Sequence, residues 1–223
     1  MNDALQLLIH GDAETYAAIW ITLKTSTLAT ILSLLIALPL GFALGFYTFP
    51  GKVIIKTLAN SFLAIPTVTI GLLVYLLLAA DGPLGNLHLL FSVPAIIIGQ
   101  TILALPIMIV MIANSSATTE NNLRETLLTL GANHWQIFIT VLQESRLAII
   151  AAAIMAYSRV ASEVGIAMML GGNIKFFTRT MTTAIALETM KGNFALGIAL
   201  GITLLFFALG ANILASTLQK RWQ

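Results

Sequence analysis

The chain has 223 residues, of which 58% are hydrophobic and only 9% charged, and its mean hydropathy is +0.96. About a quarter of the residues in a soluble domain are charged, so this composition excludes a soluble globular protein and indicates an integral membrane protein. The net charge of +2 is too small to suggest a nucleic-acid-binding protein, and the absence of cysteine excludes disulfides and thiolate chemistry.

Apolar stretches of roughly 20 residues recur along the chain, as membrane helices require and barrel strands do not. We therefore predict an all-α membrane protein with a single transmembrane domain over residues 1–223. Five stretches can cross a bilayer, at about residues 20–47, 54–80, 93–113, 137–163 and 195–214. Pro39, Pro66 and Pro106 lie inside the first three, where each breaks a backbone hydrogen bond and can bend its helix. The bent helices can line a translocation path or act as hinges, or the bends can only fix how the helices pack.

Two glycines, Gly41 and Gly45, are four residues apart in the second half of the first stretch. This spacing can let another helix approach closely. Glycine is also simply common in membrane helices, and the sequence leaves both interpretations open.

The distribution of Lys and Arg predicts the orientation, because cytoplasmic loops are enriched in them. Residues 1–16 and 81–88 carry none, whereas basic residues occur in residues 48–56, 120–146 and the C-terminal tail. This places the N-terminus outside and the C-terminus in the cytoplasm. Lys175, Arg179 and Lys191 oppose the count, because they fall outside. They are either a weakness of the predicted topology or charges kept there for use.

Residues 120–144, ENNLRETLLTLGANHWQIFITVLQE, are the most polar long stretch. They begin as a helix in which Asn122 can cap the first turn and Glu125 can reach back, and Gly131 is placed to end it. Leu123, Leu127 and Leu130 fall at helical spacing on one face. We expect this face to dock on another protein outside the bilayer. The alternative is an ordinary amphipathic cytoplasmic loop.

Sequence motifs for enzymatic chemistry are absent. The chain has no G-x-x-x-x-G-K-[ST], no G-x-S-x-G and no H-E-x-x-H. His10, His88 and His134 are far apart and lack partners at metal-ligand spacing. We expect no enzyme, no metal site and no cofactor bound by this chain, so that any vectorial work must draw energy from elsewhere.

A resemblance begins at Glu125-Thr126-Leu127 and continues through Leu130-Gly131-Ala132 to Val141-Leu142. This pattern resembles the cytoplasmic signature of ABC-importer permeases, although Thr126 and Leu127 replace two alanines and Gln143 replaces a proline. In that family the segment is the coupling helix, which docks in a groove of the ATPase subunit. The resemblance implies ATPase-coupling residues, namely Leu123, Glu125, Thr126, Leu127, Leu130, Gly131 and Ala132.

A second pattern is more specific. Arg159-x-x-x-Glu163-x-Gly165, then residues 168–174 (MMLGGNI) and Thr178, is similar to the permeases of molybdate, tungstate and sulfate importers. Residues 182–192 look most like the tungstate branch. The resemblance implies a type I importer permease fold, acting as a homodimer of five-span subunits in a prokaryotic cytoplasmic (inner) membrane. It also implies separate cytoplasmic ATPase subunits that carry ATP-Mg, and an external solute-binding protein.

The same resemblance indicates candidate residues for a translocation path or gate: Arg159, Glu163, Gly171, Gly172, Asn173, Lys175 and Thr178. Arg159 can pair with Glu163 one turn away, or it can face the path and attract an oxyanion. The glycine turn can expose N–H groups as an anion nest, or it can only permit a tight bend that forms a gate. Lys175 and Arg179 can steer anions, or they can meet carboxylates on the binding protein.

Other functions remain compatible with the sequence. The cargo can be molybdate, sulfate or another small solute, because tungstate and molybdate are nearly identical dianions. A protein of a different class, an ion-coupled carrier or channel, would act without an ATPase. A membrane scaffold that transports nothing is disfavoured by the polar residues in and beside the fourth stretch.

Overall fold

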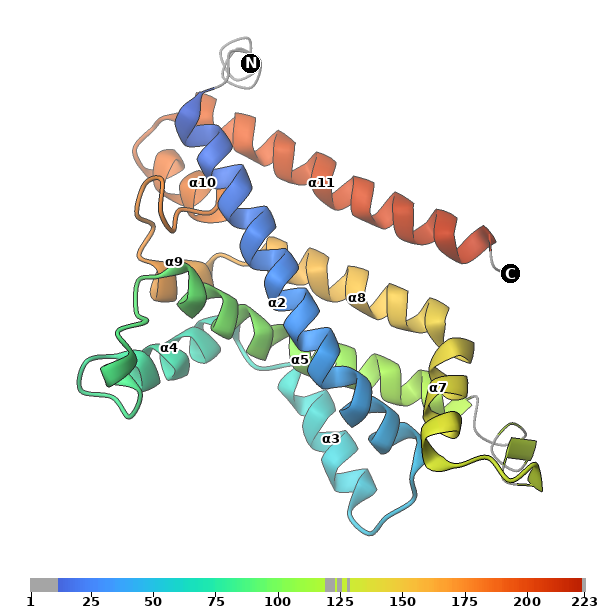
Figure 1. The fold of residues 1–223 in the computed structure, drawn as a ribbon. Coiled ribbons are helices and arrows are strands. Elements are labelled where there is room, and N and C mark those ends of the chain that lie inside the picture. Colours follow the sequence, from blue (N-terminus) through green and yellow to red (C-terminus); the bar gives the residue numbers. More distant parts are fainter. Residues whose placement is uncertain (1–11, 119–122, 124–125, 128, 222–223) are drawn as a thin grey trace.

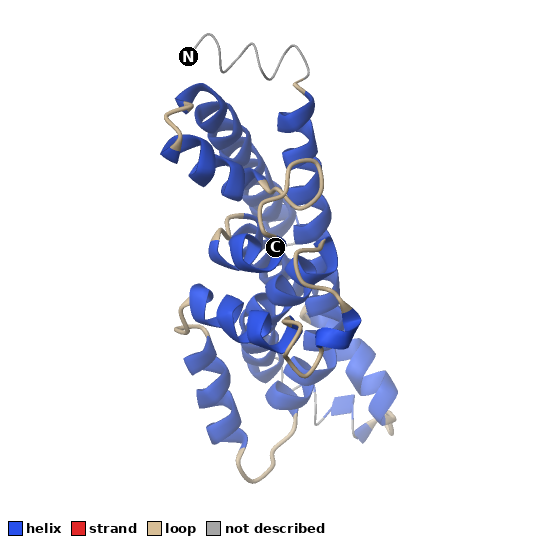
Figure 2. Cartoon of the chain, turned by 90° about the vertical axis from the view of Figure 1, so that its left-hand side faces the viewer, coloured by secondary structure: helices blue, strands red, loops and turns tan. Residues whose placement is uncertain are grey.

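The structure is a computed structural model that describes residues 12–118, 123, 126–127 and 129–221. These residues form helices and loops, with no strand among them (Figures 1 and 2), which confirms the all-α class. In chain order the elements are α2 Ala13–Phe46, α3 Lys52–Phe62, α4 Thr67–Leu78, η1 Gly85–Leu87, α5 Val93–Thr118, α7 His134–Glu144, α8 Arg146–Ala161, α9 Gly165–Gly171, α10 Met181–Met190 and α11 Phe194–Arg221.

The long helix α2 begins earlier than the apolar stretch predicted, because Asp12 caps it. The Asp12 carboxylate accepts a hydrogen bond from the Thr15 N–H at 2.8 Å. Farther along, the hydroxyls of Thr22 and Ser33 donate to carbonyls four residues back, at 2.8 and 2.7 Å. This back-bonding satisfies polar side chains inside an apolar helix. Figure 1 shows α2 crossing α5, with α8 and α11 side by side on one flank.

The main hydrophobic core lies where α2, α5 and α8 meet. Its fully buried members include Ala29 on α2, Met108 and Ile112 on α5, and Ala156 and Val160 on α8. Small residues let helix backbones approach closely, which matters in lipid because burial of apolar surface drives little association there. Two further clusters join α4 to α5 and α9, and α2 to α10 and α11.

The glycine pair on α2 makes a close contact with α5. A Cβ added at Gly41 would lie 2.8 Å from the Cβ of Ile112, and one at Gly45 would lie 2.6 Å from the carbonyl oxygen of Ala113. Any side chain at these positions would therefore push the two helices apart. This confirms the interpretation that the pair admits a second helix.

The predicted stretch at 54–80 is not one straight helix. It is divided into α3 and α4, whose axes differ by 98°. Pro66 lacks an N–H and holds the preceding residue extended, and Pro66 itself has a ψ of 131°. Consequently α3 stands away from the bundle with no buried residue, and an apolar groove of about 510 Å³ lies between it and the α2–α5 pair.

The predicted fourth stretch at 137–163 is also broken. α7 and α8 meet at 67° around Ser145, whose ψ of 5° departs from the helical value. The start is earlier than predicted, because Asn133 and Gln136 form a reciprocal capping box ahead of α7.

Within the part of the chain that the structure describes, α2 and α5 are long and apolar enough to cross a membrane, and the two bent pairs also qualify if each is one span. The apolar part of α11, Phe194–Gly210, is shorter. The helices α9 and α10 are too short to span a bilayer. The predicted number of five spans therefore remains a prediction.

Candidate functional site: two polar ends of a membrane bundle

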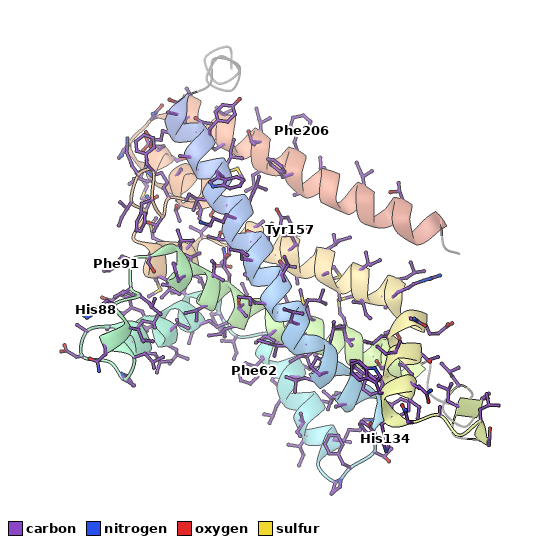
Figure 3. All side chains as sticks on the ribbon, in the orientation of Figure 1. Phe62, His88, Phe91, His134, Tyr157 and Phe206 are labelled. Atoms are coloured by element: carbon purple, nitrogen blue, oxygen red, sulfur yellow. The ribbon has the colours of Figure 1, made fainter. Side chains whose placement is uncertain are left out.

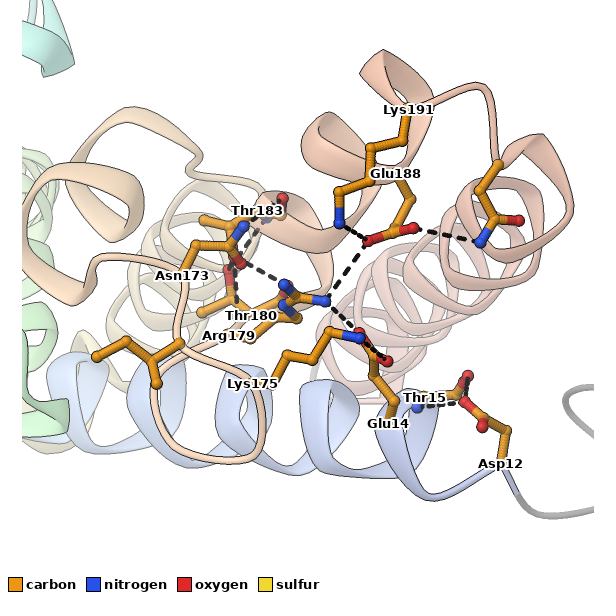
Figure 4. Close-up of polar contacts among 12 residues, drawn as sticks. Asp12, Glu14, Thr15, Asn173, Lys175, Arg179, Thr180, Thr183, Glu188 and Lys191 are labelled. Atoms are coloured by element: carbon orange, nitrogen blue, oxygen red, sulfur yellow. Dashed lines mark hydrogen bonds and ion pairs between the residues drawn. The ribbon is translucent and has the colours of Figure 1, made fainter.

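Five charged side chains form an ion-pair network near the start of α2 (Figure 4). Glu14 on α2 accepts from Lys175, with 2.7 Å between Oε2 and Nζ, and also from Arg179. Glu188 on α10 lies 3.6 Å from Arg179 Nη1 and 3.0 Å from Lys191 Nζ. Three cations and two carboxylates therefore meet at one end of the bundle and leave one net positive charge.

Arg179 is the centre of this network, because its side chain is 5% exposed and lies between the two carboxylates. A buried guanidinium without a carboxylate would cost several kcal/mol, so the pairs with Glu14 and Glu188 are what allow it to be there. The hydrogen bond from Lys191 lowers the pKa of Glu188, assisted by a hydrogen bond from Asn193 and by the nearby positive charges. Glu188 is therefore held as a carboxylate.

The turn after α9 is closed by hydrogen bonds from its own residues. Gly172 ends α9 in the left-handed conformation at φ 68°, and its N–H donates to Met168 O at 3.0 Å. The Thr178 hydroxyl donates to Gly171 O and accepts from Ile174 N at 3.0 Å. The N–H groups of Gly172 and Ile174 are thus already used, which favours the tight bend over the anion nest.

Phe91, from the loop before α5, covers this turn. Its N–H donates to Leu170 O at 2.8 Å, and a Cβ added at Gly172 would lie 2.8 Å from its ring. Asn173, in the same turn at φ 52°, donates to Thr183 O at 3.5 Å. The turn is therefore fastened to the α5 loop on one side and to α10 on the other.

Arg159 and Glu163 form the expected ion pair at the end of α8, with 2.8 Å between Nη1 and Oε2. Glu163 is buried, and its second oxygen accepts from the N–H groups of Gly165 and Ile166 at the start of α9. Arg159 keeps 43% of its side chain exposed. An arginine exposed on a membrane helix needs water or another protein beside it, because lipid would not solvate it.

The polar segment between α5 and α7 lies at the other end of the bundle (Figure 1). Glu125 and the predicted cap at Asn122 lie outside the described residues. Leu130 N donates to Thr126 O at 3.1 Å, Ala132 N donates to Leu127 O at 3.0 Å, and Gly131 has a φ of 75°. A helical turn that ends on a left-handed glycine is therefore present, as predicted.

The three leucines do not share one outward face, which corrects the expected docking surface. Leu123 and Leu127 are partly buried and pack against a cluster from α2 and α7 formed by Phe42, Phe46, Ile137 and Val141. Leu130 is 77% exposed, because it stands at the turn where the helix ends. Two leucines thus anchor the segment to its own bundle, and one is left for a partner.

No group of three or more His, Asp or Glu side chains in the described part of the chain could hold a metal ion. Figure 3 shows His88 and His134 at opposite ends of the molecule. The described residues therefore offer ion pairs and a docking segment, but no constellation for metal chemistry.

Comparison with known proteins decides the family. A family model described as "binding-protein-dependent transport system inner membrane component" matches residues 37–223. The chain belongs to this family. It is therefore a permease subunit of an ABC importer, a non-enzymatic component of the transporter.

The permease is similar to specific oxyanion permeases. It is 44% identical to the tungstate uptake system permease protein TupB of Campylobacter jejuni, over 98% of this chain and 92% of that protein. It is 40% identical to a probable anion ABC transporter permease protein of Haloferax volcanii, over 90% of this chain and 89% of that one. These relatives bear out the resemblance drawn from residues 159–192.

The fold of the permease also matches a solved structure. An inward-facing structure of the MetNI methionine ABC transporter superposes with a TM-score of 0.75, covering 94% of this chain and 96% of that one at 18% identity. At that identity the match shows the fold alone, which is that of a type I importer permease.

Sequence reasoning singled out the three cations of the permease's ion-pair network but not their partners. Glu14 lies 161 positions from Lys175, and no local pattern links them. Glu188 precedes Lys191 by three residues on α10, which is a spacing that brings side chains together on a helix. That spacing is the one signal that could have identified a partner.

Proposed function

We propose that this permease imports an oxyanion, tungstate, as a homodimer of five-span subunits driven by separate ATPase subunits. The observation that carries the proposal is the 44% identity to a tungstate uptake permease over nearly the whole chain. Tetrahedral dianions of similar size differ little in chemistry, so the binding protein that delivers the cargo sets the final selection. The permease supplies the path and the coupling.

The polar segment 123–133 meets the ATPase on the cytoplasmic side. Its exposed residues include Thr126, Leu130 and Gly131, whereas Leu123 and Leu127 hold it to the bundle. The chain has no nucleotide-binding loop of its own, so ATP-Mg belongs to the partner. The opposite end, where α2 begins, then faces outward, as the Lys and Arg content of residues 1–16, 48–56 and 120–146 predicts, while Lys175, Arg179 and Lys191 of the network oppose the positive-inside rule there.

Arg159 is the residue that the proposal places on the path. It lies near the outer end of α8, half-exposed, with one guanidinium nitrogen committed to Glu163. Met155, one turn earlier, is also exposed at 54%. A second copy packed beside this face would bring two arginines to a shared axis, where the remaining N–H groups can attract an oxyanion.

The turn Gly171–Thr178 acts as a gate element rather than as a ligand site, because hydrogen bonds of Gly172, Ile174 and Thr178 close it internally. Lys175 and Lys191 are each about half-exposed beside it. We assign these two lysines to contact with carboxylates of the binding protein. Arg179, buried between Glu14 and Glu188, holds the turn to α2 and α10.

The test is tungstate uptake by cells that lack this chain, complemented with the wild-type protein or with an Arg159 variant. We expect deletion to abolish high-affinity uptake, Arg159→Gln to lower it at least tenfold, and Arg159→Lys to retain most of it. Lys24→Gln, which removes an exposed cation from α2, is the matched control and should transport normally.

Two results would contradict the proposal. Undiminished tungstate uptake in the deletion strain would remove the assigned cargo. An Arg159→Gln subunit that no longer purifies with the ATPase would show that the pair with Glu163 is structural, so that Arg159 has no role on the path.

A further inference from the structure

Aromatic side chains form a continuous row from the molecular surface to the end of α2, near His134 in Figure 3. Trp135 lies against Phe138, with 5.4 Å between ring centroids. Phe138 meets Phe42 edge to face at 4.9 Å and 86°, and Phe42 stacks on Phe46 at 4.9 Å and 16°. Phe42 and Phe46 are nearly fully buried, whereas Trp135 is 68% exposed.

The inner end of this row is fixed to the bundle. Phe42 and Phe46 directly follow the two glycines that seat α2 on α5. At Gly45 an added Cβ would lie 2.6 Å from a backbone oxygen of α5, so the helices have no space to slide independently. A force applied to Phe42 or Phe46 is therefore applied to α2 and α5 together.

The outer end of the row is fixed to the polar segment. Leu123, Leu127 and Ala132 pack on the same cluster as Phe42 and Phe138. Among the described residues, this cluster joins the segment to α2 and α7. Besides the chain connections to α5 and α7, these rings are therefore the packed route from the segment to α2.

We propose that Phe138 and Phe42 form the mechanical joint through which movement of the 123–133 segment displaces the α2–α5 pair. The inference rests on the proposed function, because it needs an ATPase to move the segment. Both residues are positioning residues, since neither touches cargo or nucleotide. If one ring slid past the other, the favourable edge-to-face geometry and the packing would both be lost. The two rings therefore move together and transmit a displacement.

The alternative is that the rings only fill the core at the membrane interface, where aromatic residues are common. If the rings only fill space, truncating one would lower the stability of the fold. It would not uncouple the movement of the segment from the movement of the α2–α5 pair. The experiment must therefore follow movement on both sides of the joint.

The chain has no cysteine, so single reporters can be introduced cleanly. We would attach an environment-sensitive fluorophore either at Thr129→Cys, on the segment, or at Thr48→Cys, just beyond the end of α2, in the purified complex with its ATPase. Both positions are exposed. With Phe138 intact, we expect ATP to change the signal at both positions.

In Phe138→Ala we expect the signal at position 129 to persist and the signal at position 48 to fall at least tenfold, with uptake per ATP hydrolysed falling similarly. Phe138→Tyr, which retains the ring, should restore both. Phe206→Ala removes an exposed ring from α11 and is the matched control, with both signals expected unchanged. If the alanine variant does not assemble, Phe138→Leu keeps most of the volume without the ring.

If ATP still caused the full fluorescence change at both positions in Phe138→Ala and Phe138→Leu, the proposed joint would be wrong and the proposed function would be unaffected. No ATP-dependent signal at position 129 with Phe138 intact would instead overturn the coupling assigned to the segment, and the joint with it.

Discussion

At the scale of single residues, the end of the bundle where α2 begins is organised around one buried guanidinium. Arg179 is held by Glu14 from α2 and Glu188 from α10, which are distant in the sequence. Lys175 and Lys191 complete the pairing from the surface. Ion pairs rather than apolar side chains thus hold these three segments together here. Removal of either carboxylate would leave positive charge without its counterion.

The first prediction concerns Glu188→Gln. Because the lowered pKa of Glu188 favours its ionised form in the folded state, the carboxylate stabilises the fold above its ordinary pKa of about 4.5, and this contribution disappears as pH falls through the lowered value. At pH 7 we expect the variant to lose about 1.5–3 kcal/mol of unfolding free energy, as for other hydrogen bonds to charged groups.

Thermal unfolding in detergent at pH 7 and at pH 3 measures this difference. We expect the difference in stability between wild type and variant to be smaller at the lower pH. Asp81→Asn, on the exposed loop before η1, is the control and should show no such gap. A gap that stays constant with pH would mean that the charge of Glu188 does not stabilise the network.

At the scale of elements, periodicity and composition predicted the helices, and of the breaks at Pro66 and Ser145 only the first had a local signal in the sequence. The glycine pair marked the close contact between α2 and α5, and Pro66 marked the break between α3 and α4. The break at Ser145 has no proline or glycine, so nothing in the sequence marked it. The inward direction of Leu123 and Leu127 depends on Phe42 and Phe46 from a helix about 80 residues earlier, which spacing alone cannot reveal.

The second prediction tests the contact between α2 and α5. Gly45→Ala places a Cβ 2.6 Å from the Ala113 carbonyl oxygen, a backbone atom that can move aside only if α5 moves. We expect a loss of about 1–3 kcal/mol, as in other overpacked interfaces. Gly201→Ala, on α11, has no heavy atom within 4 Å of the added Cβ and is the matched control.

Unfolding of the two variants, followed in the same detergent, gives the comparison. Gly201→Ala should be as stable as wild type or slightly more stable, because alanine favours helix over glycine. Equal stability of the two variants would show that α2 and α5 do not pack as closely as described, and it would also weaken the rigid pair on which the Phe138–Phe42 joint depends.

At the scale of the whole molecule, the two ends of the bundle differ in what they offer. The end where α2 begins carries an ion-pair network with two half-exposed lysines, whereas the opposite end carries a short turn anchored by leucines and rings. Composition alone indicated a membrane protein, and the motifs at 125–132 and 159–192 indicated the family. The assembly around the permease could not be derived, because partner surfaces are not encoded as periodic patterns within one chain.

We propose that this bundle moves an oxyanion only when a separate ATPase consumes ATP. The most direct test is tungstate accumulation in proteoliposomes that contain the permease, its ATPase and the binding protein. We predict accumulation against a gradient with ATP, and none with a non-hydrolysable analogue or with the ATPase omitted. Tungstate accumulation by the permease alone, driven by an ion gradient without ATP, would contradict the account.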